Sequence, residues 1–183
     1  VLQVAVTEAV REGRPFTLEY RIRTKDGGER FVWEQGRWVS RGDNGADRLE
    51  GFIADITDRR RAETERERLV AAVEQAGEVI IVTDPEGVIQ YVNAAFERTT
   101  GYTRAEVLGK TPAMLSSGVH DDAFYRDLWD TIRSGRVWSG RIANKRKDGS
   151  LYTEEVTISP VLDAKGGVVN YVAAKGDISR QIE

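Results

Sequence analysis

The sequence has no cysteine and only one histidine among its 183 residues. The absence of cysteine excludes disulfides, thiolate metal sites and cysteinyl adduct chemistry, and it is compatible with a reducing compartment. No apolar run approaches the roughly 20 residues that a membrane helix needs, and no signal peptide is visible. We therefore expect a cytoplasmic chain that makes no membrane contact of its own.

The sequence also lacks a strong excess of charge of one sign. Apolar residues make up 40% of the chain and charged residues 31%, and the formal net charge is −3. These values are typical of a soluble globular chain and give no sign of a surface for nucleic acid. We therefore expect no nucleic-acid partner.

Two short motifs are present twice, at the same spacing. Lys25-Asp26-Gly27 returns as Lys147-Asp148-Gly149, and Asp55-Ile56-Thr57 returns as Asp177-Ile178-Ser179. The same difference in residue number separates the two copies of each motif. The sequence therefore predicts the repeat of a whole domain without insertion.

This offset also predicts how the chain is divided. Val1 corresponds to Ala123, which lies well inside the second copy, so the first copy starts about halfway. We predict the C-terminal half of one domain at residues 1–58, a helical linker at residues 59–76 and a complete domain of ordinary size at residues 77–180. The front half of the first copy would lie outside this sequence or come from another chain.

The first copy is predicted to contain the end of a helix and then an antiparallel meander. Leu2 and Val6 stand at helical spacing within residues 1–12, and Gly13 would end that helix. The expected strands, joined by glycine-containing turns, are Phe16–Thr24, Glu29–Ser40 and Leu49–Ile56.

The linker is rich in arginine, glutamate and alanine, with opposite charges three and four residues apart. A thin apolar stripe runs through Ala62, Leu69, Val73 and Ala76. Two interpretations remain open: a solvated connecting helix, or a parallel coiled-coil junction between two protomers whose seam the arginines interrupt. A homodimer formed through the linker helices and the domains is accordingly expected.

The complete copy combines a hairpin, several helices and three further strands. The expected elements are strands Val79–Thr83 and Val88–Val92, a helix Ala94–Thr100 capped by Asn93, a short helix with a capping box of Thr103 and Glu106, a loop Lys110–Val119, a helix from about Asp121 to Ser134, and strands Val137–Arg146, Leu151–Val161 and Val168–Asp177. This order excludes regular βαβ alternation. It predicts an α+β fold with a five-stranded antiparallel sheet and helices on one face.

Several motifs in this copy resemble those of a PAS domain. They are Val82-Thr83-Asp84 with Gly87, Tyr91-Val92-Asn93-Ala94-Ala95-Phe96, Thr100-Gly101-Tyr102, Glu106-Val107-Leu108-Gly109-Lys110, the Lys-Asp-Gly turn and the closing Asp177-Ile178-Ser179. Residues 1–58 resemble the C-terminal half of a second PAS domain. The resemblance implies a sensor of flavin, haem or a small metabolite, or a plain dimerisation module.

Within that family, the segments Leu128-Trp129, Val137–Gly140 and Asn144–Gly149 are most similar to the FAD-holding PAS domains of the nitrogen-fixation redox regulator, the aerotaxis transducer and the methane-monooxygenase sensor kinase. This resemblance implies a flavin pocket that contains Trp129 and Asn144.

The sequence also departs from these relatives. Lys175 stands where light-sensing flavin-binding relatives carry glutamine, and Pro112 stands near the place of an acidic residue in the nitrogen-fixation regulator. Glu154, one strand over, could pair with Lys175 and fill part of the pocket.

A comparison of the two copies gives an independent argument for a ligand. Alternation places on one face of the strand before the turn Trp138, Gly140, Ile142 and Asn144, where the first copy has Phe16, Leu18, Tyr20 and Ile22. The second copy is therefore predicted to leave a gap at Gly140 and to direct the Asn144 amide toward the helices. A buried amide without partners costs about 1–3 kcal/mol. A flat heteroaromatic ligand that contacts Asn144, Trp129 and Trp138 would fill the gap and provide hydrogen-bond partners for the amide.

A purely structural interpretation remains open as well. Gly140 could simply permit close helix packing, Asn144 could bond to the backbone at the strand end, and the two tryptophans could be core residues. His120, in a polar loop, would have to be the axial ligand of any haem. We expect neither haem nor a metal ion.

The sequence shows no phosphate-binding glycine loop and no pair of nucleophile and base. We therefore expect no catalytic residues and no turnover within this chain. The prediction is the sensory part of a bacterial-type signalling protein, in which the complete PAS domain binds FAD as a redox or oxygen sensor and relays its state through helical linkers. The output domain would lie outside this sequence, as a histidine kinase of a two-component system or a cyclic-dinucleotide enzyme. Two alternatives are a cofactor-free PAS module for dimerisation and relay, and a sensor of a small metabolite.

Overall fold

The computed structural model describes residues 7–9, 11–41 and 47–177. The positions of Leu2 and Val6, and of Ile178-Ser179 in the closing motif, lie outside the described residues. The chain divides into two compact units, Val1–Arg68 and Leu69–Glu183.

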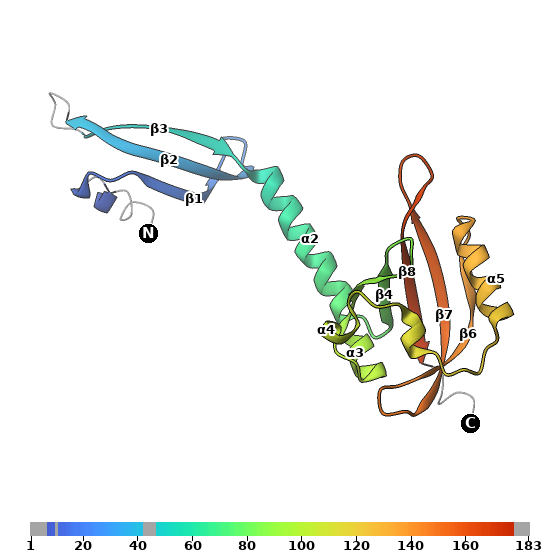
Figure 1. Cartoon of the computed structure of the whole chain (residues 1–183). Coiled ribbons are helices and arrows are strands. Elements are labelled where there is room, and N and C mark those ends of the chain that lie inside the picture. Colours follow the sequence, from blue (N-terminus) through green and yellow to red (C-terminus); the bar gives the residue numbers. More distant parts are fainter. Residues whose placement is uncertain (1–6, 10, 42–46, 178–183) are drawn as a thin grey trace. The chain divides into compact units, whose positions relative to one another are not determined.

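The first unit contains the antiparallel meander that the sequence predicts. Its strands are β1 (Phe16–Arg23), β2 (Glu29–Arg41) and β3 (Asp47–Asp55), hydrogen-bonded in the order β1-β2-β3 (Figure 1). The turn between β1 and β2 contains Gly27 at φ 86°, a conformation that glycine adopts without steric cost.

The Asp55-Ile56-Thr57 motif marks the change from strand to helix. The Asp55 carboxylate accepts a hydrogen bond from the Thr57 backbone N–H at 2.9 Å. The buried Thr57 hydroxyl in turn accepts the backbone N–H of Phe31 on β2 at 3.0 Å. Helix α2 (Thr57–Gln75) begins at this point. The motif therefore ends the meander by tying the start of the helix to the strands.

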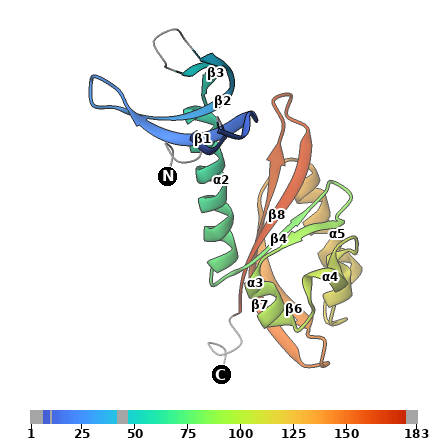
Figure 2. The ribbon, with the colours of Figure 1, turned by 90° about the vertical axis from the view of Figure 1, so that its left-hand side faces the viewer.

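The second unit has the predicted α+β architecture. Its elements in chain order are β4 (Val79–Thr83), β5 (Ile89–Val92), α3 (Ala94–Thr100), α4 (Arg104–Val107), the 3₁₀ helix η1 (Pro112–Leu115), α5 (Asp122–Arg133), β6 (Trp138–Lys145), β7 (Leu151–Leu162) and β8 (Val168–Asp177). The strands form one antiparallel sheet in the order β5-β4-β8-β7-β6. Helices α3, α4 and α5 lie on one face of this sheet (Figure 2). The prediction of a plain loop over Lys110–Val119 is wrong, because Pro112 begins the short helix η1 there.

The repeat is confirmed at the level of strand register. Phe16 on β1 pairs with Gly36 on β2, and the equivalent residue Trp138 pairs with Ile158. In the same way, the pairing of Val32 with Asp55 is repeated between Glu154 and Asp177. The three strands of the first unit therefore correspond to β6, β7 and β8 in register as far as Trp38 and Leu49, beyond which the bulges of the two units differ.

Asn93 connects three elements of the second unit, and the sequence predicted only one of these connections. Its side-chain oxygen accepts the backbone N–H of Phe96 at 3.2 Å, which caps α3 as expected. The same oxygen accepts the N–H of Ile80 on β4 at 3.0 Å. The amide nitrogen donates to the carbonyls of Val73 and Glu78, at 3.0 and 2.9 Å.

The core of the second unit consists of two separate clusters. One packs α3 and α4 against the hairpin and contains Val79, Ile81, Ile89, Val92, Ala95, Phe96, Val107 and Leu115. The other packs α5 against β6, β7 and β8 on the same face of the sheet and contains Leu128, Ile132, Trp138, Ile142, Val156 and Tyr171. Side chains of both clusters line a cavity, so the interior of this unit is not filled throughout.

Candidate ligand-binding site

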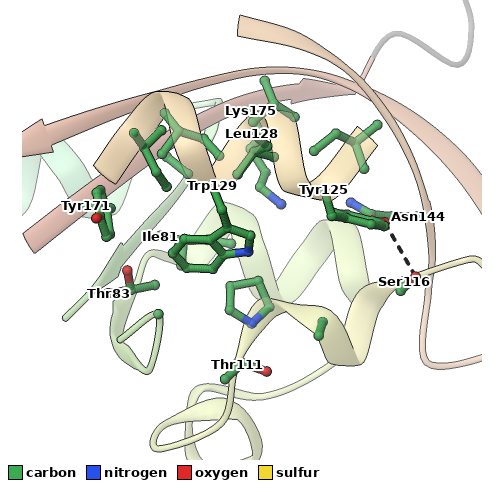
Figure 3. A pocket seen from close by; sticks show the side chains of 18 residues that line it. Ile81, Thr83, Thr111, Ser116, Tyr125, Leu128, Trp129, Asn144, Tyr171 and Lys175 are labelled. Atoms are coloured by element: carbon green, nitrogen blue, oxygen red, sulfur yellow. Dashed lines mark hydrogen bonds between the residues drawn. The ribbon is translucent and has the colours of Figure 1, made fainter. Parts of the chain in front are cut away.

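The cavity lies between α5, η1 and the sheet and has a volume of about 430 Å³. This size falls within the range of small-molecule pockets, roughly 300–1,000 Å³. Its lining residues are Ile81, Thr83, Gly87, Thr111, Pro112, Ala113, Ser116, Tyr125, Leu128, Trp129, Ile132, Ile142, Asn144, Val156, Ile158, Tyr171, Ala173 and Lys175 (Figure 3). Most of these side chains are apolar, and Lys175 carries the only charge among them.

The polar side of the cavity is built on three neighbouring strands. Asn144 on β6, Glu154 on β7 and Lys175 on β8 are diagonal neighbours on the same face of the sheet. The Asn144 amide nitrogen donates to Glu154 Oε2 at 2.8 Å, and Lys175 Nζ donates to the same oxygen at 3.2 Å. All three residues are buried, with exposed fractions of 4%, 1% and 6% for the whole residue. The sequence-based suggestion that Glu154 and Lys175 pair with each other is confirmed.

This arrangement decides which polar groups remain for a ligand. Because Glu154 takes the amide N–H of Asn144, the amide oxygen Oδ1 is the group left, and it makes no hydrogen bond within the described residues. Lys175 makes one hydrogen bond with its ammonium group, which has three donors. The polar side of the cavity therefore presents an acceptor next to donors.

Trp129 forms one wall of the cavity (Figure 3). Its ring makes an edge contact with Tyr171, with 5.9 Å between the ring centroids, and the Arg133 guanidinium lies 4.9 Å from its centroid. Gly87, in the β4–β5 turn at φ 86°, lies against the same ring. A Cβ atom at position 87 would stand 2.7 Å from the ring, so the glycine is needed for both its backbone conformation and its size.

Trp138 and Gly140 do not belong to the lining of the cavity. The indole of Trp138 lies over Gly140, so that a Cβ atom at position 140 would be 2.7 Å from it. Trp138 is buried and packs edge-on against Phe124, with 5.6 Å between ring centroids. The predicted gap at Gly140 is therefore wrong, because Trp138 fills that space. Of the six residues singled out from the sequence, Trp129, Asn144 and Lys175 line the cavity, and Glu154 accepts hydrogen bonds from Asn144 and Lys175.

Sequence reasoning did not single out the side of the cavity formed by the loop before α5. Ser116 Oγ lies 3.4 Å from the Tyr125 hydroxyl, the contact drawn as a dashed line in Figure 3. Both residues line the cavity, together with Thr111 from the segment before η1. Neither residue was among the predicted site residues, and no signal in the polar loop distinguished Ser116 from its neighbours.

His120 is engaged elsewhere and does not line the cavity. Its Nε2 accepts the backbone N–H of Ala143 on β6 at 2.9 Å, and its ring stacks on Phe124 with 4.0 Å between centroids. Among the described residues, no cluster of histidine, aspartate and glutamate has the arrangement of a metal site. In the same part of the chain, no helix combines the length and apolar character needed to cross a membrane.

Comparison with known families agrees with this architecture. The PAS domain family model matches residues 77–180, and a second model, described as the PAS fold, matches residues 2–53. The chain belongs to the PAS domain family. Both copies of the repeat are thus PAS sequences, and the cavity described above lies inside the PAS domain of the second unit.

Two relatives of this PAS protein are a regulatory protein and a transcriptional activator. The nitrogen fixation regulatory protein of Klebsiella oxytoca is 39% identical over 107 residues, which cover 58% of this chain and 22% of that protein. The bacterioopsin transcriptional activator of Halobacterium salinarum is 33% identical over 133 residues, covering 71% of this chain and 19% of that protein. The chain therefore spans about a fifth of the length of these relatives.

Solved structures show the same fold. The structure of an RNA-binding light-oxygen-voltage receptor aligns with 99% of this chain and 83% of its own, with a TM-score of 0.61 and 17% identity. The LOV domain of the Erythrobacter litoralis EL346 blue-light activated histidine kinase covers 57% of this chain and 99% of its own, with a TM-score of 0.54 and 25% identity. The chain is a sensory signalling module of the PAS type.

Proposed function

We propose that the PAS domain at residues 77–180 binds FAD and acts as a redox or oxygen sensor. The observation that carries this proposal is the cavity itself. It is large, mostly apolar and bordered by Trp129, and its polar side offers an amide oxygen next to ammonium donors. A planar ligand with a polar edge is the kind of molecule that such a cavity suits.

The donor set of the cavity fits the isoalloxazine ring of a flavin. The pyrimidine edge of that ring carries an imide N–H between two carbonyl oxygens. If flavin is bound, Asn144 Oδ1 would accept the imide N–H and Lys175 Nζ would donate to a carbonyl oxygen. The apolar side chains of Leu128, Ile142 and Val156 suit the rest of the ring.

Family relationships support the same proposal. The nitrogen fixation regulatory protein of Klebsiella oxytoca is 39% identical over the matched region, and the sequence motifs resemble the FAD-holding branch of the family. Pro112 and Lys175, which line the cavity, are two of the positions at which this chain departs from flavin-binding relatives. The relay of the signal to an output domain outside this sequence, and a homodimer formed through the PAS domains and linker helices, belong to the same proposal.

In this mechanism the residues of the chain would bind and orient the flavin and would exclude water from the cavity. Flavin, when bound, supplies reversible electron uptake. Glu154 holds the Asn144 amide in one orientation, so that its oxygen meets the ligand, and it also keeps the Lys175 ammonium in place. Trp129 and Tyr171 close one side of the cavity. β8 carries Lys175 and ends at Asp177, so a change at Lys175 would reach the end of the domain along a single strand.

The test is flavin binding by the purified chain and two cavity variants. We expect a yellow protein with a flavin absorption band. Trp129→Ala and Asn144→Leu should each weaken FAD binding at least tenfold, which corresponds to about 1.4 kcal/mol, because each removes a wall or a polar partner of the ring. Trp33→Ala in the first unit is the matched control and should bind FAD like the unchanged chain.

One observation favours a second candidate, a cofactor-free PAS module for dimerisation and relay. Trp138 fills the space at Gly140, so part of the predicted cavity is closed by the protein itself. A colourless protein that stays colourless after refolding with FAD would support this second candidate and would refute flavin binding.

A further inference from the structure

Lys175 and Glu154 form an ion pair with an unusual placement. The two groups are 3.2 Å apart, and their side chains have exposed fractions of 7% and 1%. Lys175 lines the cavity, whereas Glu154 does not and lies behind the lining. The pair therefore contributes its positively charged residue to the lining of the cavity, whereas its negatively charged residue lies outside the lining.

The first unit shows that the strands do not need this pair. The strand register relates Glu154 to Val32 and Lys175 to Ile53. The equivalent strands of the first unit thus pair with apolar residues at both positions, of which Val32 is buried and Ile53 is 59% exposed. A buried ion pair is often no more stabilising than apolar residues of similar size, because both charges lose their hydration. The retention of charge at these two positions in the second unit therefore indicates a role beyond folding.

A third feature is that the Glu154 carboxylate is only partly used. Its Oε2 accepts hydrogen bonds from both Asn144 and Lys175, whereas Oε1 is buried and has no hydrogen-bond partner in the described structure. The carboxylate thus acts through one oxygen, which places both donors at the edge of the cavity.

We propose that the Lys175–Glu154 pair sets the reduction potential of the flavin in this cavity, with Lys175 raising it and Glu154 moderating the effect. This inference rests on the proposed function. Uptake of two electrons from a reductant such as dithionite, with one proton from water, leaves a negative charge on the flavin. A positive charge at the cavity wall stabilises that reduced form more than the neutral oxidised form, and the low dielectric constant of the interior strengthens the effect.

The potential is measured on the full chain by reductive titration against a reference dye. Lys175→Met should lower the preference for reduced over oxidised flavin at least tenfold, a shift of about 30 mV to more negative potential for a two-electron couple. Glu154→Gln should shift the potential in the opposite direction, because the ammonium charge is then no longer balanced. Lys165→Met removes the same charge from an exposed turn and should leave the potential unchanged.

Lys175→Met also leaves Glu154 as a buried charge without its cation, which could destabilise the fold. A second variant therefore tests the inference without an unpaired charge. The double variant Glu154→Val with Lys175→Ile copies the residues of the first unit and leaves no charge unpaired. It should melt within a few degrees of the unchanged chain, and its potential should lie between those of the two single variants.

The possible outcomes separate this inference from the proposed function. The inference would be overturned if all variants bind flavin and their reduction potentials agree within about 9 mV, a twofold change in the preference for reduced over oxidised flavin. Flavin binding would then remain intact. A shift of Lys175→Met toward more positive potential would also overturn it. A colourless chain that does not take up FAD would overturn the proposed function, and this inference with it.

Discussion

Single residues fix the end of helix α2 to the second unit, and Glu74 is the clearest case. Its carboxylate accepts hydrogen bonds from the Tyr91 hydroxyl at 2.7 Å, the Ala94 backbone N–H at 3.1 Å and the Arg104 guanidinium at 2.5 Å. The hydrogen bond from Tyr91 is the main reason that the pKa of Glu74 is lowered. Burial, followed by the hydrogen bond to Glu74, raises the pKa of Tyr91 to about 12.

Tyr91 should therefore titrate later than an ordinary tyrosine, whose pKa is near 10. Because the pKa of this acid is raised in the folded protein, its stabilising contribution is fully present below pH 10 and is lost as the pH rises through about 12. The measurement is the ultraviolet absorbance of tyrosinate as a function of pH, for the unchanged chain and for Tyr91→Phe. The difference between the two titration curves gives the titration of Tyr91. A difference curve centred near pH 10 would contradict the geometry described for Glu74.

At the scale of elements, β6 is an edge strand whose outer side is covered by the loop before α5. The Ala143 backbone N–H donates to His120 Nε2 at 2.9 Å, and the Ala143 carbonyl accepts the Ser117 hydroxyl at 2.5 Å. Ser116 also forms a bridge with Asn144. These contacts satisfy backbone groups that an edge strand otherwise leaves open, and they hold Ser116 at the wall of the cavity.

His120→Phe tests this covering of the edge strand. Phenylalanine keeps a ring that can stack on Phe124 but has no atom that accepts the Ala143 N–H. We expect hydrogen exchange of the Ala143 amide to accelerate at least tenfold, because that amide loses its protein acceptor. The amide of Val156, in the interior strand β7, serves as the internal reference and should not change. Unchanged exchange at Ala143 would show that the loop does not protect β6.

The elements also show what could be predicted from the sequence. Alternation along β6 correctly placed Trp138, Gly140 and Asn144 on the inner face, and the repeated turn predicted the strands of both units. The gap at Gly140 was wrong because residues two apart on a strand share a face, so a large indole can lie over its neighbour. Alternation predicts the face of the sheet on which a side chain lies, but not the rotamer of that side chain. For the same reason, the partner of the Asn144 amide required the structure.

At the scale of the whole chain, the two PAS copies share their strand register but differ in their inner face. The first has Ile22, Val32 and Ile53 where the second has Asn144, Glu154 and Lys175. Three polar side chains on neighbouring strands thus distinguish the second copy from the first. The sequence offset was sufficient to find these equivalent positions, whereas the hydrogen bonds that join the three side chains depend on the fold.

This difference predicts how many flavins the chain holds. Because Asn144, Glu154 and Lys175 belong to the second PAS copy and correspond to apolar residues in the first, each chain should retain one flavin and the first copy should retain none. The central measurement is the molar ratio of flavin to protein after reconstitution of the full chain with excess FAD and removal of unbound flavin. A ratio close to one is the predicted result. A ratio near zero would contradict flavin binding, and a ratio near two would contradict its assignment to the second PAS domain.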